Sequence, residues 1–167
     1  RVVDAAGNDV PPDQDGEIWV RGPNVMKGYY QRPDDTRAVI TPDGWFRTGD
    51  GGRIDADGFV TITGRIKDLI IVGGENVYPR EIEAVLETDP GVDAAAVVGL
   101  PDASRGEAPV AFVIPAEGAA LNETAPRPLA RHQLAGYKVP KQIRIVNELP
   151  RSPIGKVLKR KLRETVG

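Results

Sequence analysis

The stretch from Gly64 to Glu83 reads GRIKDLIIVGGENVYPREIE, and the rest of the chain is interpreted outward from it. Its apolar run, Leu69–Val72, has the length and branched side chains of a buried strand. Gly73 and Gly74 follow, and paired glycines permit positive φ angles and a close approach to the backbone. Pro79 suits the first turn of a helix. That helix would bury one apolar face, formed by Ile82, Val85 and Leu86. The stretch therefore predicts a strand, a glycine turn and a helix.

The composition is that of a globular protein and excludes several kinds of site. The 167 residues are 40% hydrophobic, with a mean hydropathy of -0.30, as in a globular protein. Cysteine is absent and His132 is the single histidine, which excludes disulfides and thiolate sites and disfavours a Ser-His triad. We expect His132 to lie at the surface. No apolar run approaches the roughly 20 residues of a membrane helix, so we expect no membrane span and a cytoplasmic location.

Charge is distributed unevenly along the chain. The net charge is -2, but residues 137–163 hold nine Lys and Arg against one acid, Glu148. Such a segment indicates a polyanionic partner: nucleic acid, the phosphates of a cofactor, or the acidic face of another domain. The alternative is a well-solvated charged helix. Nucleic acid is disfavoured because only Tyr137 is interleaved with these cations, and base-stacking surfaces need more aromatic side chains.

The remaining patterns predict an α+β fold in two parts. Residues 1–64 are β-rich, with hairpin signals and short alternating runs, and are too small for a complete hydrophobic domain. Residues 66–167 suggest a compact α+β unit whose central strands, flanked by helices, can bury one face of the sheet. Its predicted strands are 69–72, 94–99, 108–114 and 142–146, and its predicted helices are 79–89, 123–136 and 157–165, the second interrupted by two prolines. Without an initial Met, the sequence is expected to be part of a larger protein.

Several motifs carry a resemblance to a known family. They are the 64–83 stretch, Gly16–Gly22 followed by Gly28–Thr36, Trp45–Asp50 (WFRTGD), Tyr137–Lys141 (YKVPK) and Pro150–Lys156 (PRSPIGK). In this order they resemble the adenylate-forming superfamily of acyl-CoA synthetases, peptide-synthetase adenylation domains and luciferases, and most of all the free-standing acyl-CoA ligases. The resemblance implies that residues 1–64 are the last β subdomain of a large amino-terminal domain. Residues 65–68 would then be a hinge and residues 69–167 a mobile carboxyl-terminal domain.

The resemblance also implies roles in nucleotide chemistry. Asp50, expected at the end of a strand, would hold the ribose hydroxyls of ATP and of the acyl-adenylate, with Arg65 as a second nucleotide contact. Lys67 would be the hinge residue of a domain rotation. Lys156 would be the catalytic lysine of adenylation, a point charge delivered by a turn rich in proline and glycine. Without the resemblance, Asp50 could simply be an acid that caps a turn, and Lys156 could be one of the lysines of a basic tail.

Further residues are implied in binding CoA. Gly73 and Gly74 would line the tunnel for its pantetheine arm, and Lys141 would contact a phosphate. The chain departs from the family at Arg105, where many CoA ligases carry an aromatic residue that stacks on adenine, although a guanidinium can stack as well.

The function expected from the resemblance is ATP-dependent activation of a carboxylic acid as an acyl-adenylate, followed by transfer of the acyl group to CoA. The cofactors are then ATP, Mg²⁺ and CoA, with no metal ligand assigned in this chain. The partners are the carboxylic acid, of unknown class, the missing amino-terminal domain, and a lysine acetyltransferase that would silence Lys156. The chain alone is expected to be inactive. The alternatives are an adenylating domain with an acceptor other than CoA and a non-catalytic basic interaction module.

Overall fold

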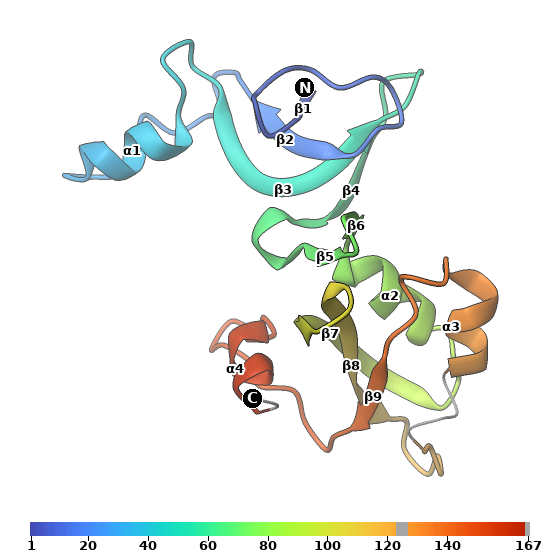
Figure 1. The fold of residues 1–167 in the computed structure, drawn as a ribbon. Helices are drawn as coiled ribbons and strands as arrows, with labels where there is room; N and C mark the ends of the chain where they lie inside the picture. Colours follow the sequence, from blue (N-terminus) through green and yellow to red (C-terminus); the bar gives the residue numbers. More distant parts are fainter. Residues whose placement is uncertain (123–126, 166–167) are drawn as a thin grey trace. The chain divides into compact units, whose positions relative to one another are not determined.

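The computed structural model describes residues 1–122 and 127–165 and divides the chain into two compact units, residues 1–67 and 68–167. Figure 1 shows the ribbon of both, and each is described separately. The expected α+β fold class is confirmed. The division falls between Lys67 and Asp68, inside the short 3₁₀ helix Ile66–Asp68 (η1).

The first unit is an antiparallel sheet in the order β1-β2-β3-β4. These strands span Val2–Val3 (β1), Gly16–Val20 (β2), Phe46–Ile54 (β3) and Val60–Arg65 (β4). The short helix Pro33–Val39 (α1) lies between β2 and β3 in the chain and has no buried residue. The buried hydrophobic residues of this unit are Val2, Val3 and Trp19, which confirms that its core is small.

The second unit is built on a five-stranded sheet. Its strands are Ile70–Val72 (β5), Glu75–Val77 (β6), Val92–Asp102 (β7), Gly106–Pro115 (β8) and Gln142–Ile145 (β9). The order is β6-β5-β8-β7, all antiparallel, and β9 pairs in parallel with β8. The helices are Pro79–Leu86 (α2), Arg127–Gln133 (α3) and Lys159–Glu164 (α4).

The central strands of this sheet are covered on both faces. Successive side chains of a strand point to opposite faces. One core contains Val97 of β7 and Val113 of β8, together with residues of α2 and α3. The other contains Ala96 and Val98 of β7 together with Leu162 of α4. Accordingly, α2 and α3 lie on one side of the sheet and α4 on the other (Figure 1).

Three details differ from the sequence-based expectations. The sheet buries both faces, because α4 covers the second one, whereas the sequence patterns accounted for only one buried face. The paired glycines lead into a further strand, β6, before the helix begins. The helices are shorter than expected: α2 ends at Leu86, where Thr88 Oγ1 donates to the Val85 carbonyl (2.7 Å), and α4 spans Lys159–Glu164. Of the expected helix 123–136, residues 123–126 lie outside the described residues, α3 covers residues 127–133, and residues 134–136 are not helical.

Candidate functional site

Asp50 and Arg65, the predicted nucleotide contacts, lie opposite each other on β3 and β4. Arg65 Nε is 3.0 Å from Asp50 Oδ1, and Arg65 Nη1 donates to the Thr48 carbonyl at 3.4 Å. The Asp50 side chain is 30% exposed and that of Arg65 is 48% exposed, so both can be reached from solvent. The ion pair engages one oxygen of the carboxylate.

A bulge in the β3–β4 pairing creates this juxtaposition. Gly52 pairs with Ile62 but Gly51 pairs with Gly64, so β4 contains one extra residue at that point. Without the extra residue, Asp50 would oppose Gly64 instead of Arg65. Asp50 therefore lies inside the continuous strand β3, and the expectation that it ends a strand was wrong.

Hydrogen bonds within the first unit fix the backbone around Asp50. Its amide donates to Thr48 Oγ1 (3.0 Å), and that hydroxyl donates to the Ile18 carbonyl (2.7 Å). The preceding amide, of Gly49, donates to Glu17 Oε1 (3.1 Å). The carboxylate is thus presented from a well-anchored strand.

Lys67 is an exposed residue of η1, directly before the division between the two units. A 3₁₀ turn has poorer hydrogen bonding than an α-helix, and such short turns often serve as connectors. Its assignment as the hinge remains a prediction.

Gly73 and Gly74 form a two-residue hairpin turn between β5 and β6, because Val72 pairs with Glu75. Their φ angles are +61° and +92°, and two positive values are what a type I′ turn requires. Apart from the glycine itself and its two chain neighbours, no heavy atom in the described part of the chain lies within 4 Å of a Cβ built on either glycine. The Gly73 amide donates to the Arg105 carbonyl (2.8 Å), which ties this turn to the β7–β8 loop. The turn therefore has an open outer surface.

Lys141 lies just before β9 and pairs with Asp102 at the end of β7; Nζ and Oδ2 are 2.5 Å apart. The Lys141 side chain is 61% exposed, whereas that of Asp102 is 4% exposed. Asp102 also accepts hydrogen bonds from the Ser104 amide and hydroxyl and from the Arg105 amide. These donors, Lys141 first, hold the pKa of Asp102 well below its ordinary value.

We expect Asp102→Asn to lower the stability of the protein at pH 7, with the difference from wild type shrinking below about pH 4. Asp102 titrates near pH 3.9 in an unfolded chain and lower in the folded protein. A carboxyl group with a depressed folded pKa stabilises the fold above its unfolded pKa and loses that contribution as pH falls through the folded value. Urea unfolding midpoints of both proteins at pH 7 and pH 3 measure this effect. An equal difference at the two pH values would contradict it.

Lys156 lies on a tight turn closed by its own backbone. The flanking residues Arg151 and Val157 form an antiparallel bridge, and the Ser152 amide donates to the Lys156 carbonyl (2.8 Å). Gly155, with φ +80°, supplies the left-handed residue of the turn, and its carbonyl accepts from Arg151 Nη1 at 2.9 Å. The Lys156 side chain is exposed, and among the described residues it forms no ion pair. A rigid turn therefore presents an uncompensated ammonium group.

Most of the basic segment is neutralised by acids. Five of its nine cations form ion pairs: Lys138 with Glu81, Lys141 with Asp102, Lys159 with Glu83, Arg160 with Glu164 and Arg163 with Asp68. Four of those acids precede the segment in the chain. The charge asymmetry of the sequence is therefore largely balanced within the folded unit, which weakens the case for a polyanionic partner.

The structure brings together some of the predicted residues. Asp50 and Arg65 form a pair in the first unit, whereas Gly73, Gly74, Lys141 and Lys156 belong to the second. The sequence reasoning missed Asp102 and Glu83 as partners of lysines, because the partners are 39 and 76 residues apart and no local pattern signals the pairing. The described residues contain no group of three or more His, Cys, Asp or Glu that could hold a metal ion. None of the described helices is long and apolar enough to cross a membrane.

Comparisons with known proteins agree with these features. The family model described as AMP-binding enzyme C-terminal domain matches residues 81–156, and that described as AMP-binding enzyme matches residues 1–30. A feruloyl-CoA synthase from Amycolatopsis sp is 46% identical over 167 residues, which are all of this chain and 34% of that protein.

Two solved structures are similar over 99% of this chain. ATP-bound MatB from Rhodopseudomonas palustris is 46% identical with a TM-score of 0.90, and 33% of its chain is covered. The amide bond synthetase McbA from Marinactinospora thermotolerans is 42% identical with a TM-score of 0.93, and 34% of its chain is covered. The chain thus spans about a third of the length of each of these relatives.

Proposed function

This chain belongs to the AMP-binding enzymes and carries their carboxyl-terminal domain, and from this premise we propose that it is part of an ATP-dependent acid–CoA ligase. The complete protein would activate a carboxylic acid as an acyl-adenylate and transfer the acyl group to CoA. The observation that carries the proposal is the closed turn that presents the uncompensated charge of Lys156. The rest of the amino-terminal domain would supply the pocket for the acid.

Asp50 and Arg65 suit the recognition of a nucleotide. A carboxylate with an accessible oxygen can accept hydrogen bonds from a vicinal diol, as in ribose, and the adjacent guanidinium can contact a phosphate. Because Arg65 pairs with Asp50 across the two strands, both groups are ordered before a ligand binds. Asp50 would then hold the ribose of ATP and of the adenylate, and Arg65 would contact the phosphate side. Mg²⁺ would accompany the ATP phosphates, and no residue of this chain is assigned to it.

Lys156 would act in the first half-reaction. ATP supplies an activated α-phosphate, to which a carboxylate oxygen of the acid bonds as the bond to the pyrophosphate leaving group breaks. Two anionic groups approach each other in this step, and the Lys156 ammonium would offset the negative charge that builds up between them. The rigid turn favours this role because a group that is already oriented loses little freedom on reaching its working position.

The second half-reaction, transfer of the acyl group to CoA, would use other residues of the second unit. Gly73 and Gly74, open on their outer surface, would leave space for the pantetheine arm of CoA, and Lys141 would contact a CoA phosphate. The CoA sulfur would bond to the acyl carbon as AMP leaves. Rotation of the carboxyl-terminal domain about Lys67 would switch the enzyme from adenylation to thioester formation.

A different acceptor is the second candidate. One structural relative is named an amide bond synthetase, so in that protein the acyl group is joined to nitrogen. An amine acceptor would need adenylation by Lys156 but no space for pantetheine. The open glycine turn favours CoA. A non-catalytic basic interaction module is disfavoured, because most of the basic segment is neutralised by ion pairs.

The test uses the full-length protein that contains this chain. Acid-dependent exchange of pyrophosphate into ATP is measured with aromatic, short-chain, dicarboxylic and fatty acids, and product formation is then measured with CoA and with amines. Acid-dependent pyrophosphate exchange together with formation of a CoA thioester supports the proposal and identifies the class of acid. Exchange with amide but no thioester selects the second candidate, and a protein that exchanges with no acid of any class refutes both.

Regulation by acetylation follows from the same proposal. Acetylation would remove the Lys156 charge, and the exposed side chain is accessible to a lysine acetyltransferase. Mass spectrometry after treatment with acetyltransferase would test this, and modification of neighbouring lysines without Lys156 would count against it.

A further inference from the structure

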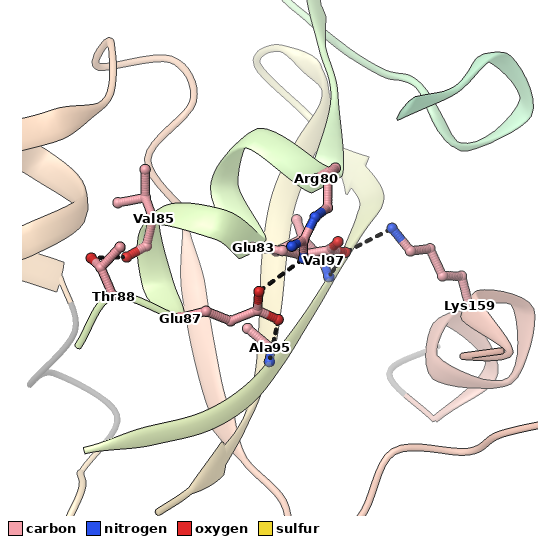
Figure 2. Close-up of polar contacts among 8 residues, drawn as sticks. All are labelled: Arg80, Glu83, Val85, Glu87, Thr88, Ala95, Val97 and Lys159. Carbon is pink, nitrogen blue, oxygen red and sulfur yellow. Dashed lines mark hydrogen bonds and ion pairs between the residues drawn. The ribbon is translucent and has the colours of Figure 1, made fainter. Parts of the chain in front are cut away.

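Glu83 of α2 is a buried charged residue with two binding partners. Its side chain is 9% exposed, and burying a carboxylate is unfavourable unless hydrogen bonds and an opposite charge compensate for it. Oε1 accepts a hydrogen bond from the Val97 amide (2.9 Å) and lies 2.7 Å from Lys159 Nζ. The Lys159 side chain is itself only 17% exposed. Figure 2 shows the carboxylate between the strand and the lysine.

This contact joins elements from opposite faces of the sheet. The strand β7 is at the edge of the sheet order, with β8 as its neighbour. Glu83 belongs to α2, which covers one face, and Lys159 is the first residue of α4, which covers the other. The two side chains therefore meet around the outer edge of β7, at Val97. An ion pair at this place fixes the beginning of α4 relative to both α2 and the sheet.

The beginning of α4 is directly connected to the Lys156 turn. Lys159 follows Lys156 by three residues, and the intervening Leu158 donates its amide to the Pro150 carbonyl (2.7 Å). The hydrogen bonds of the turn hold its two strands to each other but do not hold them to the sheet. That attachment comes from Leu149 and Leu162, which are buried in the second core, from Val157, which packs against it, and from the Lys159–Glu83 pair. These three side chains supply apolar contact without direction, whereas the ion pair sets an orientation for the beginning of α4.

From this geometry we propose that Glu83 is a positioning residue for Lys156. Its carboxylate holds Lys159, and Lys159 sets the place from which the turn delivers the Lys156 ammonium. The inference rests on the proposed role of Lys156 in adenylation. It does not make Glu83 or Lys159 a catalytic residue, because neither is assigned a contact with substrate.

The chain offers a matched control at the end of the same helix. Glu87, one turn after Glu83, also reaches the edge of β7: its Oε1 accepts from the Ala95 amide at 3.4 Å. Its ion pair, however, is with Arg80 of α2 itself (2.8 Å) and does not involve α4 (Figure 2). Glu87 therefore shares the location and the contact with β7 but lacks the connection to the turn.

The experiment compares Glu83→Gln, Lys159→Met and Glu87→Gln in the full-length protein. Glutamine is nearly isosteric and its oxygen can still accept from Val97, so Glu83→Gln removes the charge while retaining the contact with β7. Pyrophosphate exchange gives kcat and KM for adenylation, and thioester formation from supplied acyl-adenylate gives the second step. Amide hydrogen exchange of residues 152–158 reports the order of the turn independently of activity.

We expect Glu83→Gln and Lys159→Met each to lower kcat for adenylation by about tenfold or more, because small displacements of a catalytic group are costly. KM and the second step should stay within about twofold, amide exchange of the turn should accelerate, and the double variant should be no worse than either single one. Glu87→Gln should match the wild type. Lys159→Arg, which keeps the positive charge, should retain most of the wild-type kcat for adenylation.

Two results would overturn the inference. One is an unchanged kcat in Glu83→Gln, or a loss equal to that of Glu87→Gln. The other is unchanged amide exchange in the turn. If the wild type exchanges pyrophosphate with no acid, the proposed function fails, and amide exchange still decides whether Glu83 orders the Lys156 turn.

Discussion

Lys156→Ala in the full-length protein is expected to slow acid-dependent pyrophosphate exchange by about two to three orders of magnitude, the usual effect of removing one charge-stabilising donor. Thioester formation from supplied acyl-adenylate should stay close to the wild-type rate, since the charge that Lys156 is proposed to offset develops only when the acid meets the α-phosphate. Separate assays of the two half-reactions measure both effects.

Lys161→Ala is the matched control for Lys156→Ala. Lys161 is an exposed lysine of the same basic segment, and among the ion pairs of the described residues none involves it. Its removal changes the net charge by the same amount and should leave exchange unaffected. Equal losses in the two half-reactions of Lys156→Ala would show that the residue is not specific to adenylation.

Gly74→Leu is expected to have the opposite selectivity. A leucine side chain would occupy the open space outside the β5–β6 turn, where the pantetheine arm is proposed to pass, and should lower thioester formation by about 100-fold with adenylation largely retained. Measurement of thioester formation from supplied acyl-adenylate at increasing CoA concentration would show the loss.

The control for Gly74→Leu must carry the same backbone cost. Gly74 has φ +92°, where any L side chain is strained. Gly118→Leu is suitable, because Gly118 lies in the same unit, has φ +75° and likewise has no atom within 4 Å of its constructed Cβ among the described residues. A similar loss of thioester formation in both variants would attribute the effect to strain, and the proposed path for pantetheine would be wrong.

Local patterns in the sequence predicted much of the second unit. The branched run before Gly73 is β5, and the helix that begins at Pro79 is α2, as its apolar spacing indicated. The strand β6 was missed because Glu75 and Asn76 are polar and exposed, although two glycines between strands are themselves a hairpin signal. The second buried face was missed although residues 94–98 (AAAVV) and 108–114 (APVAFVI) are continuous apolar runs, typical of strands buried on both faces, because such runs do not reveal which element covers each face. Only the placement of Leu162 settles it.

The candidate site was predictable residue by residue but not as an arrangement. The motifs supplied Asp50, Arg65 and Lys156, yet their partners depend on the tertiary structure. The bulge that sets Arg65 opposite Asp50 depends on a single extra residue in β4, which has no distinctive pattern in the sequence. The Glu83–Lys159 pair joins residues 76 positions apart. Such pairings follow from packing of the complete sheet, and a single sequence does not encode them locally.

The outer edge of β7 has a consequence for the behaviour of the protein at high concentration. An apolar strand with free amides is a template on which a strand of another molecule can add, and this is a common route to aggregation. Here Glu83 and Glu87 accept the hydrogen bonds of the Val97 and Ala95 amides. An incoming strand would have to displace two carboxylates before it could pair. Glu83 and Glu87 therefore protect β7, the longest of the described strands, against self-association.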